Sequence, residues 1–233
     1  LHSFPTRRSS DLFYVRHIGK LVPKYYLPGV IPFKKLLKTG RTLPFTPYDA
    51  RPDDMAMLQY TGGTTGAPKA AMLTHTNLRA NANQAIAWVP MLHEGGENFL
   101  SLLPFFHAFG LSLSLLCAVG LAATQVVLPK FGADLVLAAW KRRPATFFPG
   151  VPVMFDRLAT RARATGANLS SCKIAVCGAA PNPLAVAQAW EEATGGTIIE
   201  GYGMTESSPI ILGNPISPAR RPGTLGVPYP STQ

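Results

Sequence analysis

Residues 173–203, KIAVCGAAPNPLAVAQAWEEATGGTIIEGYG, contain the pattern that decides the fold. An apolar run at 173–179 is followed by a helical stretch at 184–194 and by a second apolar run at 197–203. Neither run alternates with polar residues, which is typical of strands that are covered on both faces of a sheet. We therefore predict a strand, a helix and a second strand in this order, the building unit of an α/β fold.

The same rhythm extends outward through most of the chain. Further strands are expected at 56–61, 70–73, 99–104, 124–129 and 145–150, and further helices at 76–88, 109–121, 135–142 and 153–164. We predict an α/β protein with mixed, largely parallel sheets that are covered by helices. In such folds the binding loops follow the carboxyl ends of the strands, and the distinctive motifs of this chain follow expected strands.

The composition is that of a globular protein with a packed core. Of the 233 residues, 47% are apolar and 15% are charged, which excludes a disordered chain, a collagen and a long coiled coil. Cys117, Cys172 and Cys177 have no metal-ligand spacing, so we expect reduced core cysteines rather than disulfides or a zinc site. Residues 99–129 lack Lys, Arg, Asp and Glu, but Pro104 and Gly120 divide them into short elements, which favours core over a membrane span.

The net charge of +10 is concentrated near the N-terminus. Residues 13–44 carry +7 without any acidic residue, whereas residues 45–233 carry +2. The basic residues alternate with apolar ones, which is typical of a segment that contacts a membrane surface, and equally of a basic helix and connector on the protein surface. No nucleic-acid motif accompanies the charge, so we expect no nucleic-acid partner. We expect a cytoplasmic protein, with peripheral membrane contact through residues 13–44 as an open alternative.

The ten residues from Tyr60 to Lys69, YTGGTTGAPK, are the strongest chemical signal. Glycines let a backbone approach an anion closely, threonines add hydroxyl donors, and the lysine adds a positive charge. The segment is not a Walker A loop, because Ala67 and Pro68 precede the lysine and Ala70 follows it. It therefore predicts a phosphate-binding loop, with these candidate residues: Thr61, Gly62, Gly63, Thr64, Thr65, Gly66 and Lys69.

A second motif, EGYGMTES, covers residues 200–207 and follows another apolar run. It offers an aromatic face for a base, a threonine hydroxyl, and a carboxylate that could hold Mg²⁺ beside phosphate oxygens. Together the two motifs supply phosphate donors, a metal ligand and a base platform. The candidate residues of the second motif are Glu200, Gly201, Tyr202, Gly203, Met204, Thr205 and Glu206.

These motifs resemble those of the AMP-binding, adenylate-forming enzymes, which include the acyl-CoA synthetases. Matching segments also occur in order at 103–107 (LPFFH), 178–181 (GAAP) and 223–228 (GTLGVP). The chain most resembles the long-chain fatty acid–CoA ligases, which tend to have YTGGTTG where relatives have YTSGTTG; Gly62 stands at that difference. The alternatives are a fatty acyl–AMP ligase, an aryl-acid ligase and a non-catalytic nucleotide-binding paralogue.

The resemblance implies a two-step reaction, in which a carboxylate attacks the α-phosphate of ATP and coenzyme A then takes the acyl group. It implies that residues 61–69 hold the β- and γ-phosphates, that Glu206 ligates Mg²⁺, and that Thr205 contacts the α-phosphate or the substrate carboxylate. Tyr202 would stack on adenine, and His107 would lie near the acyl carboxylate. The same likeness places residues 150–152 near the acyl channel, and it assigns the adenine pocket to Gly178, Ala179 and Ala180.

The ends of the chain carry their own expectations. Residues 1–12, LHSFPTRRSSDL, resemble translated sequencing-adapter DNA and are expected to be an artefact. We expect residues 13–54 to form a basic surface segment and connector, and residues 55–233 to be part of the family's large N-terminal domain. The family's later Tyr-x-x-Gly-Asp segment and its C-terminal domain with a catalytic lysine do not occur in the sequence. We therefore expect these residues alone to be inactive in the complete adenylation reaction.

Overall fold

The computed structural model describes residues 17–21, 27–61 and 66–232. It divides into two units, residues 1–49 and residues 50–233. The first unit contains helix α2 (Phe33–Gly40), in which no residue is buried. Phe33, Leu36 and Leu37 are exposed on this helix, which also carries three lysines. Membrane contact through this segment stays a prediction, and the expected artefact at 1–12 lies outside the described residues.

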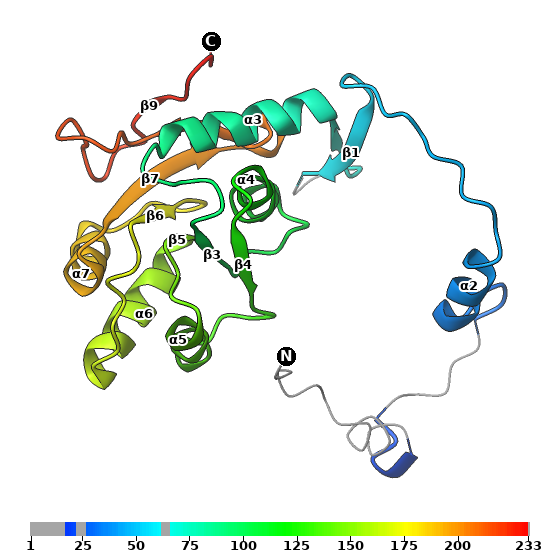
Figure 1. Ribbon diagram of the computed structural model, residues 1–233, viewed down its shortest axis with the longest axis horizontal. Helices are drawn as coiled ribbons and strands as arrows, with labels where there is room; N and C mark the ends of the chain where they lie inside the picture. The colour runs from blue at the N-terminus through cyan, green and yellow to red at the C-terminus, as the bar shows by residue number, and fades with distance from the viewer. Residues whose placement is uncertain (1–16, 22–26, 62–65, 233) are drawn as a thin grey trace. The chain divides into compact units, whose positions relative to one another are not determined.

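A seven-stranded sheet forms the centre of the second unit (Figure 1). Its first five strands are parallel, as the sequence predicts, and two further strands continue the sheet in antiparallel pairing. The strand order is β4-β3-β5-β6-β7-β8-β9. The strands are β3 (Asn98–Ser101), β4 (Thr124–Val127), β5 (Phe147–Gly150), β6 (Ile174–Cys177), β7 (Thr197–Gly203), β8 (Ile210–Gly213) and β9 (Val227–Pro228).

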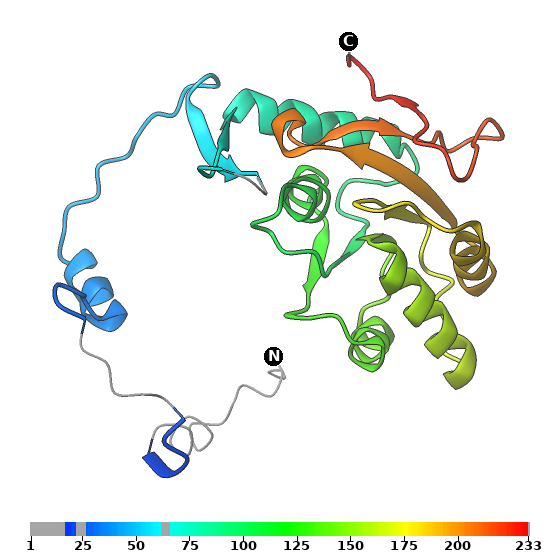
Figure 2. The ribbon, with the colours of Figure 1, turned by 180° about the vertical axis from the view of Figure 1, so that it is seen from behind.

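Helices cover both faces of this sheet (Figures 1 and 2). One face packs against α3 (His75–Trp88), the π-helix η2 (Gly110–Leu116) and α4 (Cys117–Gly120), and the other against α5 (Ala133–Arg142), α6 (Pro152–Thr165) and α7 (Leu184–Thr194). Successive side chains of a strand point to opposite faces. Accordingly, Phe147 packs on the α3 side and Phe148 on the α5 side, each 0–1% exposed. Burial on both faces explains why the strands lack polar alternation.

The apolar stretch at 99–129 is core, as the sequence predicts. Phe99 and Leu100 of β3 and Ala118 of α4 are each 0% exposed, and the stretch is divided among several short elements. Within the described ranges, no helix has the length and apolar character needed to cross a membrane. The helix expected at 109–121 is wound as η2 followed by α4. At its start Gly110 lies so close to the Pro104 carbonyl oxygen that a Cβ there would be 2.3 Å away.

The first two strands of the second unit correct one expectation. β1 (Met55–Tyr60) and β2 (Ala70–Thr74) pair with each other as a separate two-stranded antiparallel sheet. The segment 61–69 therefore connects the two strands of a hairpin. The prediction that this loop follows a strand of the parallel sheet is wrong. Antiparallel strands can be joined by a short connection, whereas parallel strands need a crossover of a dozen or more residues.

The three cysteines are core residues. Cys117, Cys172 and Cys177 are all buried and free. Burial raises the pKa of Cys117 to about 12 and the pKa of Cys172 still further. Burial and the neighbouring Glu200 carboxylate raise the pKa of Cys177 to about 12. Because the thiolate is the reactive form, these thiols are poor nucleophiles near neutral pH.

A buried ion pair joins the starts of two strands. Lys173 Nζ lies 2.7 Å from Glu97 Oε1, and the Glu97 side chain is 0% exposed. The same oxygen accepts a hydrogen bond of 2.9 Å from the His93 N–H. Burial would raise the pKa of Glu97, but the hydrogen bond from Lys173 and its neighbours outweighs burial and holds the pKa below its ordinary value.

Lys173→Met is expected to reduce the free energy of unfolding by about 2 kcal/mol at pH 7, less than for a fully buried pair because Lys173 is partly exposed. The lowered pKa of Glu97 stabilises the fold above the unfolded pKa, and this stabilisation is lost as the pH falls through the folded pKa. The difference from wild type should therefore shrink between pH 7 and pH 4 in urea unfolding. Lys141→Met, at an exposed lysine, is the control. An equal loss of unfolding free energy in both variants would contradict a stabilising role of the Lys173–Glu97 ion pair.

Candidate functional site

The loops that follow the parallel strands gather at one edge of the sheet. β3 lies between β4 and β5, and its connection to β4 passes over one face while the connection from β4 to β5 passes over the other. This reversal of strand order is the place where α/β sheets bind ligands. The sequence-predicted residues His107, Gly178 and Tyr202 follow or end β3, β6 and β7 at this edge.

A cavity of about 70 Å³ lies among these loops. His107, Gly178, Ala179 and Tyr202 all line it, so the structure brings these predicted residues together. The rest of its lining is largely apolar: Phe109, Leu113, Val176, Gly201, Gly203, Pro209, Ile210 and Tyr229. The cavity can hold a small apolar group beside the imidazole of His107.

The orientation of His107 is set by its own loop. Its Nδ1 accepts a hydrogen bond of 3.2 Å from the Phe109 N–H. A neutral imidazole with this acceptor carries its proton on Nε2. His107 is exposed, so Nε2 is available as a donor to an anionic group such as a carboxylate.

A larger cavity of about 580 Å³ adjoins the first. Gly201, Tyr202, Gly203 and Ala179 line both cavities. The volume falls in the range of small-molecule sites, about 300–1,000 Å³. Tyr202 is 44% exposed, which leaves its ring free to stack on a planar ligand. The remaining lining residues are Ala180, Pro181, Asn182, Glu200, Gly223, Thr224 and Leu225.

Thr205 and Glu206 lie on the short helix η3 (Thr205–Ser207), directly after β7. The turn is closed by Ser207, whose Oγ donates to the Met204 carbonyl at 2.8 Å. Thr205 is half-buried and Glu206 is exposed. This places a hydroxyl and a carboxylate beside the cavities but not in their walls.

The hairpin approaches the same edge. β2 contacts η3, and Gln59 Nε2 of β1 donates to the Phe106 carbonyl oxygen at 3.0 Å, one residue before His107. Thr61 closes the hairpin loop, because its N–H and its hydroxyl both donate to the Lys69 carbonyl, at 2.9 and 3.3 Å. Lys69 is exposed and lines neither cavity. Gly62, Gly63, Thr64 and Thr65 lie outside the described residues.

The arrangement of the acidic residues limits the ways in which the site could bind a metal ion. Among the residues that the structure describes, no three His, Cys, Asp or Glu side chains gather as a metal cage. Mg²⁺ usually binds to one or two carboxylates together with substrate phosphates and water. The exposed Glu206 fits this arrangement, in which the ligand supplies most of the oxygens.

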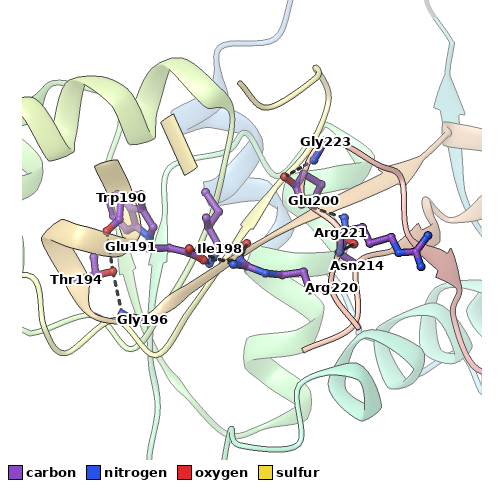
Figure 3. Close-up of polar contacts among 10 residues, drawn as sticks. All are labelled: Trp190, Glu191, Thr194, Gly196, Ile198, Glu200, Asn214, Arg220, Arg221 and Gly223. Carbon is purple, nitrogen blue, oxygen red and sulfur yellow. Dashed lines mark hydrogen bonds and ion pairs between the residues drawn. The ribbon is translucent and has the colours of Figure 1, made fainter. Parts of the chain in front are cut away.

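Some site residues were missed by the sequence reasoning. The turn at 221–225 forms one wall of the larger cavity through Gly223, Thr224 and Leu225. Asn214 and Arg220 hold this turn in place (Figure 3). The segment 223–228 carried a recognisable pattern, but its position opposite β7 depends on contacts between distant residues. The residues 150–152, expected near an acyl channel, line neither cavity.

Comparisons with known proteins identify the family of the chain. The chain matches the family model "AMP-binding enzyme" over residues 17–233. A long-chain-fatty-acid–CoA ligase of Yersinia pestis is 39% identical over 223 residues, which cover 94% of this chain and 40% of the relative. A ligase of the same name from Bacillus subtilis is 41% identical over 179 residues, which cover 77% of this chain and 32% of the relative.

The fold also matches a solved structure. ATP-bound MatB from Rhodopseudomonas palustris superposes with a TM-score of 0.72 and 30% identity, over 84% of this chain and 38% of MatB. The matched residues thus span between about a third and two fifths of the length of these relatives. Since the family model covers nearly all of the described residues, the chain belongs to the AMP-binding enzyme family.

Proposed function

We propose that the chain is the nucleotide-binding part of a long-chain fatty acid–CoA ligase. The enzyme would join a fatty acid to ATP as an acyl-adenylate, with release of pyrophosphate, and transfer the acyl group to the thiol of coenzyme A. The observation that carries the proposal is the 580 Å³ cavity with Tyr202 in its wall, next to the turn that bears Thr205 and Glu206. The relatives at 39% and 41% identity are long-chain-fatty-acid–CoA ligases by name, which supports the substrate class.

The described residues would act mainly by position and charge. The cavity would hold the base and ribose of ATP, with the Tyr202 ring stacked on the base. Lys69 would neutralise the phosphates and Glu206 would bind Mg²⁺ beside them. His107 would donate through Nε2 to the acid substrate in the smaller cavity. Holding both reactants in line is the main contribution that such a site makes to the first step.

The smaller cavity supports an apolar acid. Phe109, Leu113, Ile210 and Tyr229 line it beside His107, so a carboxylate could meet the imidazole while its chain contacts apolar groups. Burial raises the pKa of Tyr229, which keeps the phenol neutral. These features suit the first carbons of an aliphatic acid.

Binding of non-hydrolysable acyl-adenylates to the purified chain tests the proposal. In isothermal titration calorimetry we expect dodecanoyl sulfamoyl-adenosine to bind at least tenfold more tightly than AMP, because the acyl group adds buried apolar area. Benzoyl sulfamoyl-adenosine is the matched comparison. Equal or tighter binding of the benzoyl compound would overturn the fatty-acid assignment, and binding of AMP with no gain from either acyl group would favour a non-catalytic nucleotide-binding role.

A further inference from the structure

One buried amide connects the two walls of the larger cavity. Asn214 Nδ2 donates to Glu200 Oε2 of β7 at 3.0 Å and to the Thr224 carbonyl of the opposite turn at 2.8 Å. Asn214 Oδ1 accepts from the Arg221 N–H at 3.0 Å. Both donors of the amide are thus used, and one side chain fixes the distance from β7 to the turn at 221–225.

Asn214 reaches the cavity only through other residues. It is 1% exposed and does not line the cavity, whereas Glu200 and Thr224, the groups that it holds, do. Glu200 also accepts a hydrogen bond of 3.3 Å from the Gly223 N–H (Figure 3). Its carboxylate is therefore bonded both to Asn214 and to the turn at 221–225. The backbone of Asn214 is fixed as well, since its N–H donates to the Glu200 carbonyl at 2.9 Å and its carbonyl accepts from Trp88 Nε1 at 3.0 Å.

A second anchor holds the beginning of the turn. Arg220 forms a two-pronged ion pair with Glu191 of α7, and its Nη1 donates to the Ile198 carbonyl at 2.6 Å (Figure 3). The hydrogen bond with Glu191 raises the pKa of Arg220. Arg220 therefore ties the turn to the sheet near the start of β7, whereas the Asn214 amide sets the wall that faces the cavity.

We propose that Asn214 is a positioning residue for nucleotide binding, which sets the width of the cavity by holding Glu200 and the turn at 221–225 in register. The inference rests on the proposed nucleotide site. A buried hydrogen-bond network in which all members are satisfied holds its groups rigidly. Without the amide, the turn keeps its anchor at Arg220 and the Gly223 bond to Glu200, but it loses the bonds from Asn214 to Thr224 and Arg221.

The test compares two buried asparagines of the same chain. Asn214→Ala is expected to weaken the binding of Mg·ATP by about tenfold in calorimetry, because two backbone bonds of the cavity wall are lost. Asn81→Ala is the matched control. Asn81 is 3% exposed and also makes two backbone bonds, to the Ile210 carbonyl at 2.8 Å and from the Ile210 N–H at 3.1 Å. Ile210 lines only the smaller cavity, so this asparagine holds no wall of the larger cavity, where the nucleotide is proposed to bind. Asn81→Ala should lower the thermal midpoint about as much as Asn214→Ala does, but it should leave the affinity for Mg·ATP within about twofold of the wild-type value.

A charge swap separates positioning from general destabilisation. Asn214→Asp places a carboxylate against Glu200 and removes the donor, so ATP binding should fall at least as far as in Asn214→Ala. In the double variant with Glu200→Gln, the glutamine amide can donate to the aspartate, which restores the bond to residue 200 but not the one to the Thr224 carbonyl, so we expect roughly a threefold gain in affinity over Asn214→Asp.

The outcomes are distinct. Equal loss of affinity in Asn214→Ala and Asn81→Ala, or no recovery in the double variant, would overturn the positioning role while the nucleotide site stands. A wild-type chain that binds no ATP or AMP would overturn the proposed function and this inference with it.

Discussion

Gly203→Ala is expected to destabilise the second unit strongly and to abolish measurable ATP binding. A Cβ at Gly203 would lie 2.2 Å from the Pro209 carbonyl oxygen and 2.8 Å from the Pro209 carbonyl carbon. Both are backbone atoms, which cannot rotate away, so β7 and β8 must separate where Gly203 pairs with Ile210. We expect a loss of about 3 kcal/mol, which lowers the thermal midpoint by roughly 6–12 °C in a unit of this size.

Gly201→Ala, two residues earlier on β7, is the matched control. Its Cβ would meet the Leu212 carbonyl oxygen and Val176 Cγ1 at 3.7 Å, which is ordinary contact. We expect the thermal midpoint to stay within about 2 °C of wild type. Differential scanning fluorimetry measures the thermal midpoints of both variants and of the wild type. Similar midpoints for the two would show that the β7–β8 pairing yields more easily than the close approach at Gly203 implies.

The parallel sheet could be predicted because its signal is local. Each strand from β3 to β7 is a short apolar run, and Phe147 and Phe148 show why no polar residue alternates, since each faces a different helical layer. The five helices expected in the second unit are all present, with the one at 109–121 wound as η2 and α4. Local apolar content is therefore sufficient to predict a strand that is buried on both faces of the sheet.

The antiparallel elements depended on contacts that no local pattern reveals. β8 has four residues and β9 has two, and Leu212 of β8 pairs with Pro228 of β9 across the turn at 221–225. Such short strands, one with a proline, carry little periodicity. The pairing of β1 with β2 as a separate sheet was not predicted, because the sequence indicates that each run forms a strand but not which strand it pairs with.

The candidate site shows the same difference between local sequence signals and contacts between distant residues. Tyr202, Thr205 and Glu206 lie within five consecutive residues and could be found as one motif. The role of Asn214 depends on Glu200 and Thr224, which lie fourteen and ten residues away and meet only in the folded protein. Candidate ligand-binding residues can thus be predicted from motifs, whereas the residues that hold them in place require the structure.

Glu206→Gln is expected to have the largest effect on the chemical step. Glu206 is exposed on η3, so the amide should fold as well as the acid and leave the thermal midpoint unchanged. In a ligase with the proposed activity we expect acyl-dependent ATP–pyrophosphate exchange to fall by about 100-fold, the effect of losing one charge-stabilising group. The reason is that an amide oxygen is a weaker ligand than a carboxylate for a hard cation such as Mg²⁺.

A magnesium titration distinguishes loss of the metal ligand from other losses. Glu206→Gln should raise the Mg²⁺ concentration that gives half-maximal exchange, whereas Lys69→Ala should weaken ATP binding at every Mg²⁺ concentration, because it removes a charge that acts on the phosphates directly. Glu192→Gln is the control, since Glu192 is exposed on α7, pairs with Arg163 of α6 at 3.3 Å, and lines neither cavity. If Glu206→Gln kept the wild-type magnesium requirement, the carboxylate would have to act on the substrate itself, and the metal would be held by the phosphates and water alone.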